Sequence, residues 1–344
     1  MSNSNLTGWG PNGPHGNITL LYDHSLCTLE TCDLTLSSFL YLPSLPGNTI
    51  YAAIFGIYLI TQLFLGIKHK TWGYMFATVL GLPLEVVGYV GRIMLHYSPF
   101  DYNNFLIYLV TLTIAPALLS ASIYLCLARI VVVYGENLSR FRPRTYTIVF
   151  CTCDLICLVL QALGGAIASG ANSDSSSNLG KNLMLAGLIF QDISLALFAI
   201  CCTDFFLRVR KSKGNWNLRY LDITNSRLFK VFLLGLMTAT ITIFTRSSYR
   251  IVELSGGFNS TLFTSDEAVF MIFEGLMIVI ATSCLTLLHP AVCFQGAFAS
   301  ANFSFRIKKD ARDKSMISDQ ESQNSGVPLS LMNELSTEQV GRAK

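Results

Sequence analysis

Charged side chains are scarce in this sequence. Asp, Glu, Lys and Arg make up only 13% of its 344 residues, about half the share that soluble globular domains usually carry. Half of the residues are hydrophobic (51%), and the mean hydropathy is +0.48. So few polar side chains cannot cover a water-facing surface of this size. A soluble enzyme of one or two domains is therefore excluded.

The sequence also lacks the motifs of several other classes. Among its five histidines, only His289 falls within a long apolar run, which excludes a zinc hydrolase. The Cys-Thr-Cys run at 151–153 has no second ligand pair, and the glycine-lysine pair at Lys181 lacks the flanking residues of a phosphate-binding loop. We therefore predict no catalytic residue, no metal site, no cofactor and no nucleic-acid partner.

What the sequence does contain is seven long apolar runs. A helix needs about 20 apolar residues to cross ~30 Å of hydrocarbon, and runs without alternation are not those of a membrane barrel. The predicted helices cover residues 49–67, 72–95, 104–133, 146–168, 183–207, 229–251 and 268–294. The predicted fold class is an all-α polytopic membrane protein with seven transmembrane helices.

The distribution of Lys and Arg predicts the orientation of these helices. The first fifty residues contain neither, whereas the links after the first, third and fifth helices and the C-terminal tail are all basic. Because short basic loops stay in the cytosol, we place the N-terminus outside and the C-terminus inside. The predicted parts are an extracellular segment 1–48, a membrane domain 49–296 and a disordered cytosolic tail 297–344, whose composition turns polar.

Local signals on the outer side agree with this orientation. Asn5, Asn17 and Asn259 begin N-glycosylation triplets there, whereas a similar triplet at Asn137 falls on the cytosolic side and is expected to stay bare. Cys27 and Cys32 lie in the outer segment, where a disulfide would persist; a bridge and two free thiols both remain open. The other eight cysteines are interpreted as packing residues.

Charged residues inside the predicted helices are the strongest functional signal. Each costs at least ~2.5 kcal/mol to insert and is usually paired or lines a wet cavity. They are Glu85, Arg92, Asp154, Asp192, Asp204, Arg246, Arg250 and Glu274. Five acids against three arginines make the interior acidic, which suits a cationic head such as an amine. All of them except Asp204 are candidates for a substrate path.

Structural interpretations stand beside the functional one. Arg250 is close enough to the outer interface either to snorkel to lipid head groups or to pair. Arg246 lies deeper, so we expect it to pair with Glu85 or Glu274, and such a pair can serve only to fix helix register. The functional interpretation is strongest for Glu85, because near the bilayer midplane this side chain must be paired, protonated or hydrated.

Four motifs together resemble a known family. They are Glu85–Arg92, Leu112–Pro116, the segment from Asp154 through Gln161 to Gly165, and Phe244–Arg250 with Glu253. These residues are similar to those of the fungal lipid-translocating exporters, a family that includes aminocholesterol-resistance proteins and an exporter of sphingoid long-chain bases. The resemblance implies a seven-helix fungal plasma-membrane protein that moves sphingoid bases or related amphiphiles outward and confers resistance to them.

This substrate class accounts for the charged residues. A sphingoid base has one cationic amine, two or three hydroxyls and a long chain that remains in lipid. We expect Glu85, with Asp154 and Asp192 as further candidates, to hold the ammonium, and the arginines to keep the carboxylates ionised. Four glycines would allow close helix contact or leave a gap for the head group: Gly88, Gly91, Gly164 and Gly165.

One other class remains open. Seven helices with the N-terminus outside is also the layout of a receptor, although no acid stands beside Arg129 and no Asn precedes Pro290. The alternative is a lipid-sensing receptor or a regulator of other lipid transporters. Expected partners are membrane lipids and sphingoid bases, together with a protein that supplies energy or relays a signal.

Overall fold

The structure is a computed structural model. It describes residues 9–10, 13–14, 27, 32, 34, 37, 39, 41–170, 174–212, 220–256, 267–295 and 298. Two compact units are distinguished, Met1–Asn302 and Phe303–Lys344, and the second lies wholly outside the described residues. The predicted glycosylation sites Asn5, Asn17 and Asn259 also lie outside them.

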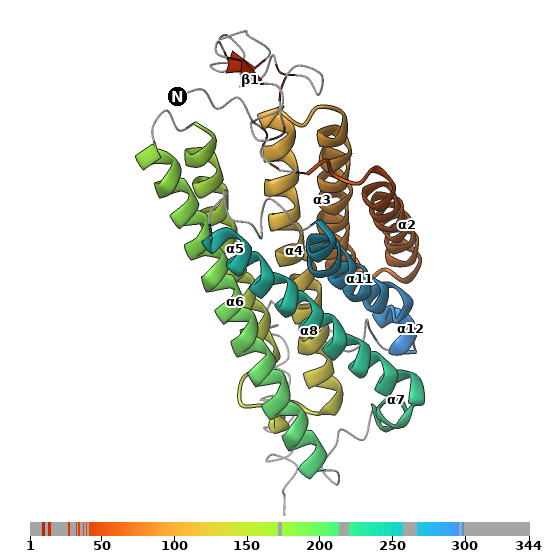
Figure 1. Cartoon of the computed structure of the whole chain (residues 1–344). Coiled ribbons are helices and arrows are strands. Elements are labelled where there is room, and N and C mark those ends of the chain that lie inside the picture. The colour runs from red at the N-terminus through yellow and green to blue at the C-terminus, as the bar shows by residue number, and fades with distance from the viewer. Residues whose placement is uncertain are drawn as a thin grey trace, which may run out of the picture. The chain divides into compact units, whose positions relative to one another are not determined.

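Within these described residues, seven helices are long and apolar enough to cross a membrane, which confirms the predicted fold class (Figure 1). The first six are α2 (Leu45–His69), α3 (Trp72–Tyr97), α4 (Tyr102–Tyr134), α5 (Pro143–Ser169), α6 (Asp174–Lys211) and α8 (Arg227–Ser255). The seventh is continuous through α10 (Glu267–Phe270), the π-helical segment η5 (Met271–Leu276) and α11 (Met277–Leu287).

Short elements join or flank these helices. They are the 3₁₀ turn η3 (Glu136–Leu138), α7 (Leu221–Asn225), α12 (Pro290–Cys293) and the antiparallel strand pair β1 (Trp9–Gly10) and β2 (Gly13–Pro14). Since successive long helices run in opposite directions, the start of α2 lies at the same end of the bundle as the links α3–α4, α5–α6 and α8–α10. We call this the Leu45 end, and the opposite one the His69 end.

The predicted end of the seventh helix is wrong. Instead of running to residue 294, α11 ends at Leu287 and a separate helix, α12, begins at Pro290. The reason is the proline, which has no N–H and pushes the residue before it out of the helical region. His289 accordingly has an extended ψ of 130°, and its side chain caps α12 by accepting a bond from the Ala291 N–H at 3.3 Å.

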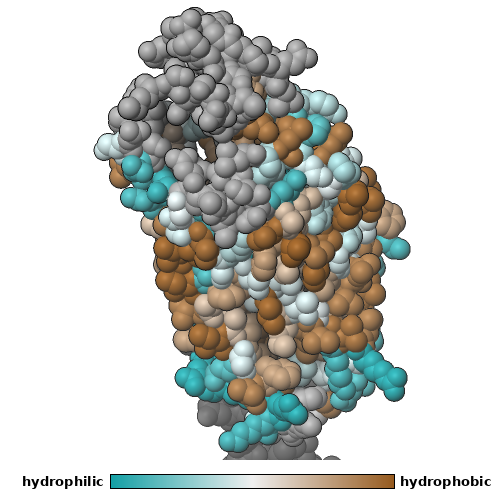
Figure 2. Space-filling view, in the orientation of Figure 1, coloured by the Kyte–Doolittle hydropathy of each residue, from teal (hydrophilic) through white to brown (hydrophobic). Residues whose placement is uncertain are grey.

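The surface of the helices is that of a multi-pass membrane protein. Large apolar side chains point outward, as at Ile60 (70% exposed) and Leu234 (60% exposed). Figure 2 shows them gathered in a belt across the face in view, with hydrophilic residues on both sides of it. Exposed apolar area on this scale is not stable in water, so the belt is the lipid-contacting surface.

Small residues bring neighbouring helices close together. A Cβ on Gly88 of α3 would overlap Cδ2 of Leu112 in α4, and one on Gly164 of α5 would lie 2.6 Å from the backbone nitrogen of Met184 in α6. Gly91 also faces α4, with Tyr108 3.2 Å from its hypothetical Cβ. Of the two roles considered, the structure shows close helix contact at Gly88, Gly91 and Gly164. Gly165 has only ordinary contacts, with Val110 3.6 Å from its hypothetical Cβ.

Two matched glycine substitutions test this packing. We expect Gly88→Ala to lower the free energy of unfolding by about 1–3 kcal/mol, because the added methyl group would force α3 away from Leu112. Gly56→Ala in α2 is the control, since nothing lies within 4 Å of its hypothetical Cβ, and Ala is preferred in a helix by about 0.5–1 kcal/mol. Thermal unfolding in detergent measures both; equal stability of the two variants would contradict the close contact.

Candidate functional site

Charged side chains from three helical elements meet in the interior. Arg246 of α8 forms an ion pair with Glu274 of η5, and each side chain is only 1% exposed. Glu85 of α3 is equally buried and interacts electrostatically with both of them. Of the two partners considered for Arg246, the hydrogen-bonded one is therefore Glu274. We call Glu85, Arg246 and Glu274 the central cluster.

Arg246 also replaces a missing backbone hydrogen bond in α4. Its Nη2 donates to the carbonyl oxygen of Leu112. Pro116 stands four residues further along α4 and has no N–H, so this carbonyl lacks its usual partner within the helix. One guanidinium thus satisfies the backbone gap in α4 and the carboxylate of η5. Through these two bonds it fixes three helical elements relative to one another.

The π-helical segment positions Glu274. A π turn adds a residue to the helix and shifts the face that later side chains present. Here it is supported by Tyr51 of α2, whose hydroxyl donates to the carbonyl of Met271 at 2.8 Å. Gly275 provides the space, because a Cβ there would lie 2.5 Å from the Tyr51 ring. The segment therefore holds Glu274 toward Arg246.

A second ion pair lies nearer the Leu45 end. Arg250 donates to Oε2 of Glu253 at 2.6 Å, and the two side chains are 1% and 2% exposed. The pair is built within one helix, three residues apart. Of the two interpretations considered for Arg250, snorkelling and pairing, the structure shows a buried pair.

Arg92 is held at the Leu45 end by several segments at once. Its guanidinium donates to Oδ1 of Asn48 at 3.2 Å and to the Tyr41 hydroxyl at 3.1 Å. The carboxylate of Glu267 lies 3.9 Å away and accepts a 2.5 Å bond from the Ser44 N–H. Three aromatic rings face the cation, at Phe39, Tyr108 and Phe270. Segment 41–44 is thereby fastened over the ends of α3 and α10.

The central cluster, Arg250 and Arg92, together with their partners, form a buried polar network. Many polar atoms in this network are unpaired. In the described part of the chain, the following buried atoms of the central cluster, of Arg92 and Arg250 and of nearby side chains have no hydrogen-bond partner: Glu85 Oε1, Tyr89 OH, Arg92 Nη1, Tyr108 OH, Arg246 Nε, Ser247 Oγ, Tyr249 OH, Arg250 Nη2 and Glu274 Oε2. Folded proteins leave few such atoms unsatisfied. The arrangement therefore calls for water or polar ligand groups between the helices.

The charges in this network do not balance. Each of its three arginines has one carboxylate partner: Arg92 with Glu267, Arg246 with Glu274, and Arg250 with Glu253. Among the residues that the structure describes, Glu85 forms no ion pair, and its Oε1 accepts no hydrogen bond. Four carboxylates thus stand against three guanidinium groups, and Glu85 is the one left over.

The other acids of the predicted path lie in different surroundings. Asp154 of α5 accepts from Ser120 at 2.7 Å and from Tyr124 at 3.0 Å, both in α4. Asp192 of α6 accepts from Ser248 of α8 at 3.1 Å. No described contact links either acid to the central cluster. Hydroxyl groups, not arginines, are their partners.

Asp204 does not belong in the interior, where the sequence placed it. Its carboxylate is 40% exposed and pairs with Arg208 at 2.9 Å and with Arg140 at 3.1 Å. Both arginines lie toward the His69 end, in or near basic links. Asp204 is therefore part of a surface ion-pair network at that end of α6.

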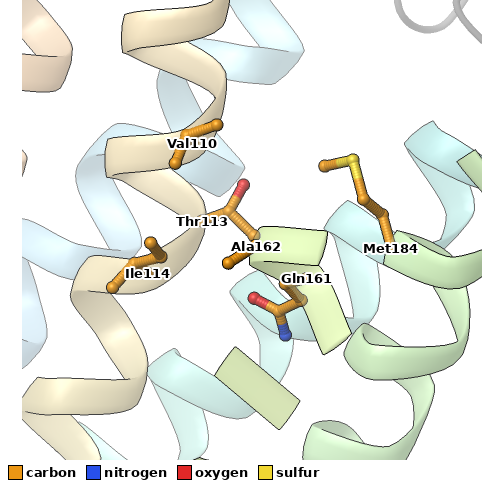
Figure 3. Close-up of a pocket in the computed structure, with 6 residues that line it drawn as sticks. All are labelled: Val110, Thr113, Ile114, Gln161, Ala162 and Met184. Carbon is orange, nitrogen blue, oxygen red and sulfur yellow. The ribbon is translucent and has the colours of Figure 1, made fainter. Parts of the chain in front are cut away.

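A small pocket lies between α4, α5 and α6, with an empty volume of about 180 Å³ including its open mouth. Figure 3 shows its lining: Val110, Thr113, Ile114, Gln161, Ala162 and Met184. The Gln161 amide donates to Gln191 at 2.8 Å, while its own Oε1 is buried without a partner. Sites for whole drug-sized ligands are roughly 300–1,000 Å³, so this pocket is too small for a complete amphiphile.

Several members of the network are not predicted from the sequence. Asn48 and Glu267 each stand one residue outside a predicted helix, and Tyr41 stands in the segment before the first one. None of the three lies within a predicted helix, so none was considered as a partner for Arg92. That position, one residue beyond a run, is the signal that would have identified two of them.

The structure decides between the two alternatives that the sequence left open for Cys27 and Cys32. Cys27 and Cys32 form a disulfide with their Cα atoms 5.5 Å apart. They cluster with Phe100 in the link between α3 and α4. The bridge therefore lies at the Leu45 end.

A seven-helix membrane protein with a buried, charge-rich interior is the class that fold and site define. The chain matches the family described as RTA1 like protein over residues 78–297, a range that includes the whole central cluster. It belongs to that family, which confirms the relationship indicated by its motifs.

Named relatives come from Saccharomyces cerevisiae. The chain is 32% identical over 287 residues to the sphingoid long-chain base transporter RSB1, covering 75% of this chain and 74% of the relative. It is 30% identical to Protein RTA1 (62% of this chain, 65% of the relative) and 31% identical to Protoporphyrin uptake protein 1 (59% and 65%). No solved structure matches.

A double-mutant cycle tests the ion pair of the central cluster. We expect Arg246→Ala and Glu274→Ala each to lower the free energy of unfolding by about 3–5 kcal/mol, because each leaves a buried charge without its partner. The double variant should lose clearly less than the sum of the two. Chemical unfolding in detergent micelles measures all three; strictly additive losses would show that the two side chains do not interact.

Proposed function

We propose that this protein moves sphingoid long-chain bases, or related amphiphiles with a cationic amine, across the plasma membrane toward the outside and so confers resistance to them. The relationship to a sphingoid base transporter supports lipid transport in general. The observation that carries the finer proposal is Glu85, a fully buried carboxylate without a cationic partner among the described residues.

An ammonium group fits the atoms left unpaired around Glu85. It offers three N–H donors and accepts nothing. Glu85 Oε1 and Glu274 Oε2 are buried acceptors without donors, and the Tyr89 hydroxyl is also unpaired. Tyr89 interacts electrostatically with both carboxylates, so the three groups share one region. A primary amine is therefore the head group that supplies what this site lacks.

The remainder of such a substrate needs no enclosed cavity. Its hydrocarbon chain is as stable in the bilayer as against the apolar belt of the helices. Only the polar head requires a route between the helices, and buried polar side chains extend from Glu85 toward the Leu45 end through Arg250 and Arg92. On the proposed orientation, that end faces the outside of the cell.

The orientation can be tested by glycosylation. With the Leu45 end outside, endoglycosidase should sharpen or shift the band of the protein expressed in a eukaryotic cell. Replacing Asn5, Asn17 and Asn259 by Gln should abolish the shift. The matched control is Asn137→Gln in η3, which should change nothing, because this triplet is expected on the cytosolic side. A glycan on Asn137 would reverse the assignment.

Translocation can be tested with purified protein in liposomes containing a fluorescent sphingoid base. We expect wild type to speed its appearance in the other leaflet. Glu85→Gln should slow that movement by about tenfold or more, since a charge-assisted hydrogen bond contributes roughly 1.5–3 kcal/mol. Asp204→Asn is the control: it makes the same chemical change at an exposed ion pair and should move lipid like wild type.

Two results would contradict the proposal. Movement no faster than in protein-free liposomes would favour a receptor or a regulator of another transporter. Equal rates for wild type and Glu85→Gln, with both folded, would retain a translocator but remove Glu85 from its path.

A further inference from the structure

We propose that Glu85 exchanges the substrate ammonium for a proton, so that each amphiphilic cation is moved in one direction as one proton moves in the other. The inference rests on the proposed function, because it concerns the same carboxylate. It goes further by assigning the source of energy to a proton gradient acting directly on this chain.

The first step is the charge count. All three arginines of the network are already matched to a carboxylate, at Glu267, Glu274 and Glu253. Glu85 is the fourth acid, and its side chain is 1% exposed. An isolated ionised carboxylate in a medium of low polarity is too costly to persist and takes up a proton or a counter-ion. When no substrate is bound, a proton is the occupant available.

The second step is that the protein itself does not neutralise Glu85. The charged groups that act on it are Arg246 from α8 and Glu274 from η5. Arg246 is committed to Glu274 and to the carbonyl of Leu112. Arg246 attracts an ionised Glu85 and Glu274 repels it, so the two neighbouring charges oppose each other, and burial is what favours binding of a cation or proton at Glu85.

In the part of the chain that the structure describes, the other elements around Glu85 present neutral side chains. Tyr89, one turn along α3, carries a neutral hydroxyl without a partner. From α2, the rings of Tyr51 and Phe55 pack against the Tyr89 ring. From α4, Leu112 and Thr111 face the neighbouring turn of α3 at Gly88.

The third step is the balance of the exchange. A protonated Glu85 and an incoming ammonium give the carboxylate–ammonium pair and one released proton. On the other side of the membrane, protonation of the carboxylate breaks that pair and releases the ammonium. One carboxylate cannot hold both cations, so the empty carrier returns protonated. A full cycle moves one positive charge each way and no net charge.

The test uses a probe whose own charge cannot change. N,N,N-trimethylsphingosine, labelled with a radioisotope, has no neutral form that crosses lipid unaided. Wild-type proteoliposomes are prepared with the lumen one pH unit more acidic than the medium and with the membrane potential clamped. One-for-one exchange should concentrate the probe on the acidic side about tenfold, the ratio set by one pH unit.

Variants identify the group responsible. Glu85→Gln should show no accumulation, because an amide neither titrates nor pairs with a cation. Asp204→Asn should accumulate the probe like wild type. Wild type that equilibrates the probe across the membrane without concentrating it would overturn proton exchange and leave the proposed transport standing. Wild type that moves neither this probe nor sphingosine would end both proposals.

A second measurement covers the case in which the site rejects a trimethylated head but moves sphingosine. In weakly buffered detergent, at a pH at which free sphingosine is an ammonium ion, its binding to wild type should then release close to one proton per base bound, recorded with a pH-sensitive dye. Glu85→Gln should release none. Binding by wild type without proton release would overturn the exchange.

Discussion

The arrangement of the helices depends on the side chain of Arg246. Without its bond to Leu112, the gap that Pro116 opens in α4 would have no donor. Without its bond to Glu274, a buried carboxylate would lose its ion-pair partner. In hydrocarbon, neither group has water as a substitute. The guanidinium of Arg246 therefore links α8 both to α4, at the residue whose backbone hydrogen bond Pro116 removes, and to the π-helical segment η5.

This arrangement explains how an acidic residue can be available for function in so charged an interior. An arginine that faced Glu85 alone would cancel its charge. Here Arg246 is occupied by Glu274, so Glu85 feels the positive charge without being hydrogen-bonded by it. Arg246 thus holds three helical elements together without forming a hydrogen bond to Glu85 in the described structure.

The sequence was sufficient to predict where the helices lie, but not which buried charged side chains pair with one another. The apolar runs predict six of the seven helix starts to within four residues, because the hydrocarbon thickness sets the length of a span. The exception is α6, which begins at Asp174 instead of residue 183, because its first turns are polar and lie outside the apolar run. The predicted end of the seventh helix was wrong, because Pro290 interrupts the helix although the apolar run continues past it. The partner of Arg246 remained ambiguous, because Glu85 and Glu274 lie at compatible depths. The π turn that directs Glu274 toward Arg246 has no signature in the sequence pattern.

The anchoring of Arg92 has a consequence for how much of the chain the membrane domain comprises. Three of its partners, Phe39, Tyr41 and Asn48, come from the stretch between residues 39 and 48, which was predicted to lie outside the membrane. Because these residues contact a buried side chain of α3, they are part of the folded helix bundle. A shortened protein that begins at residue 49 would leave the buried Arg92 side chain without these three contacts.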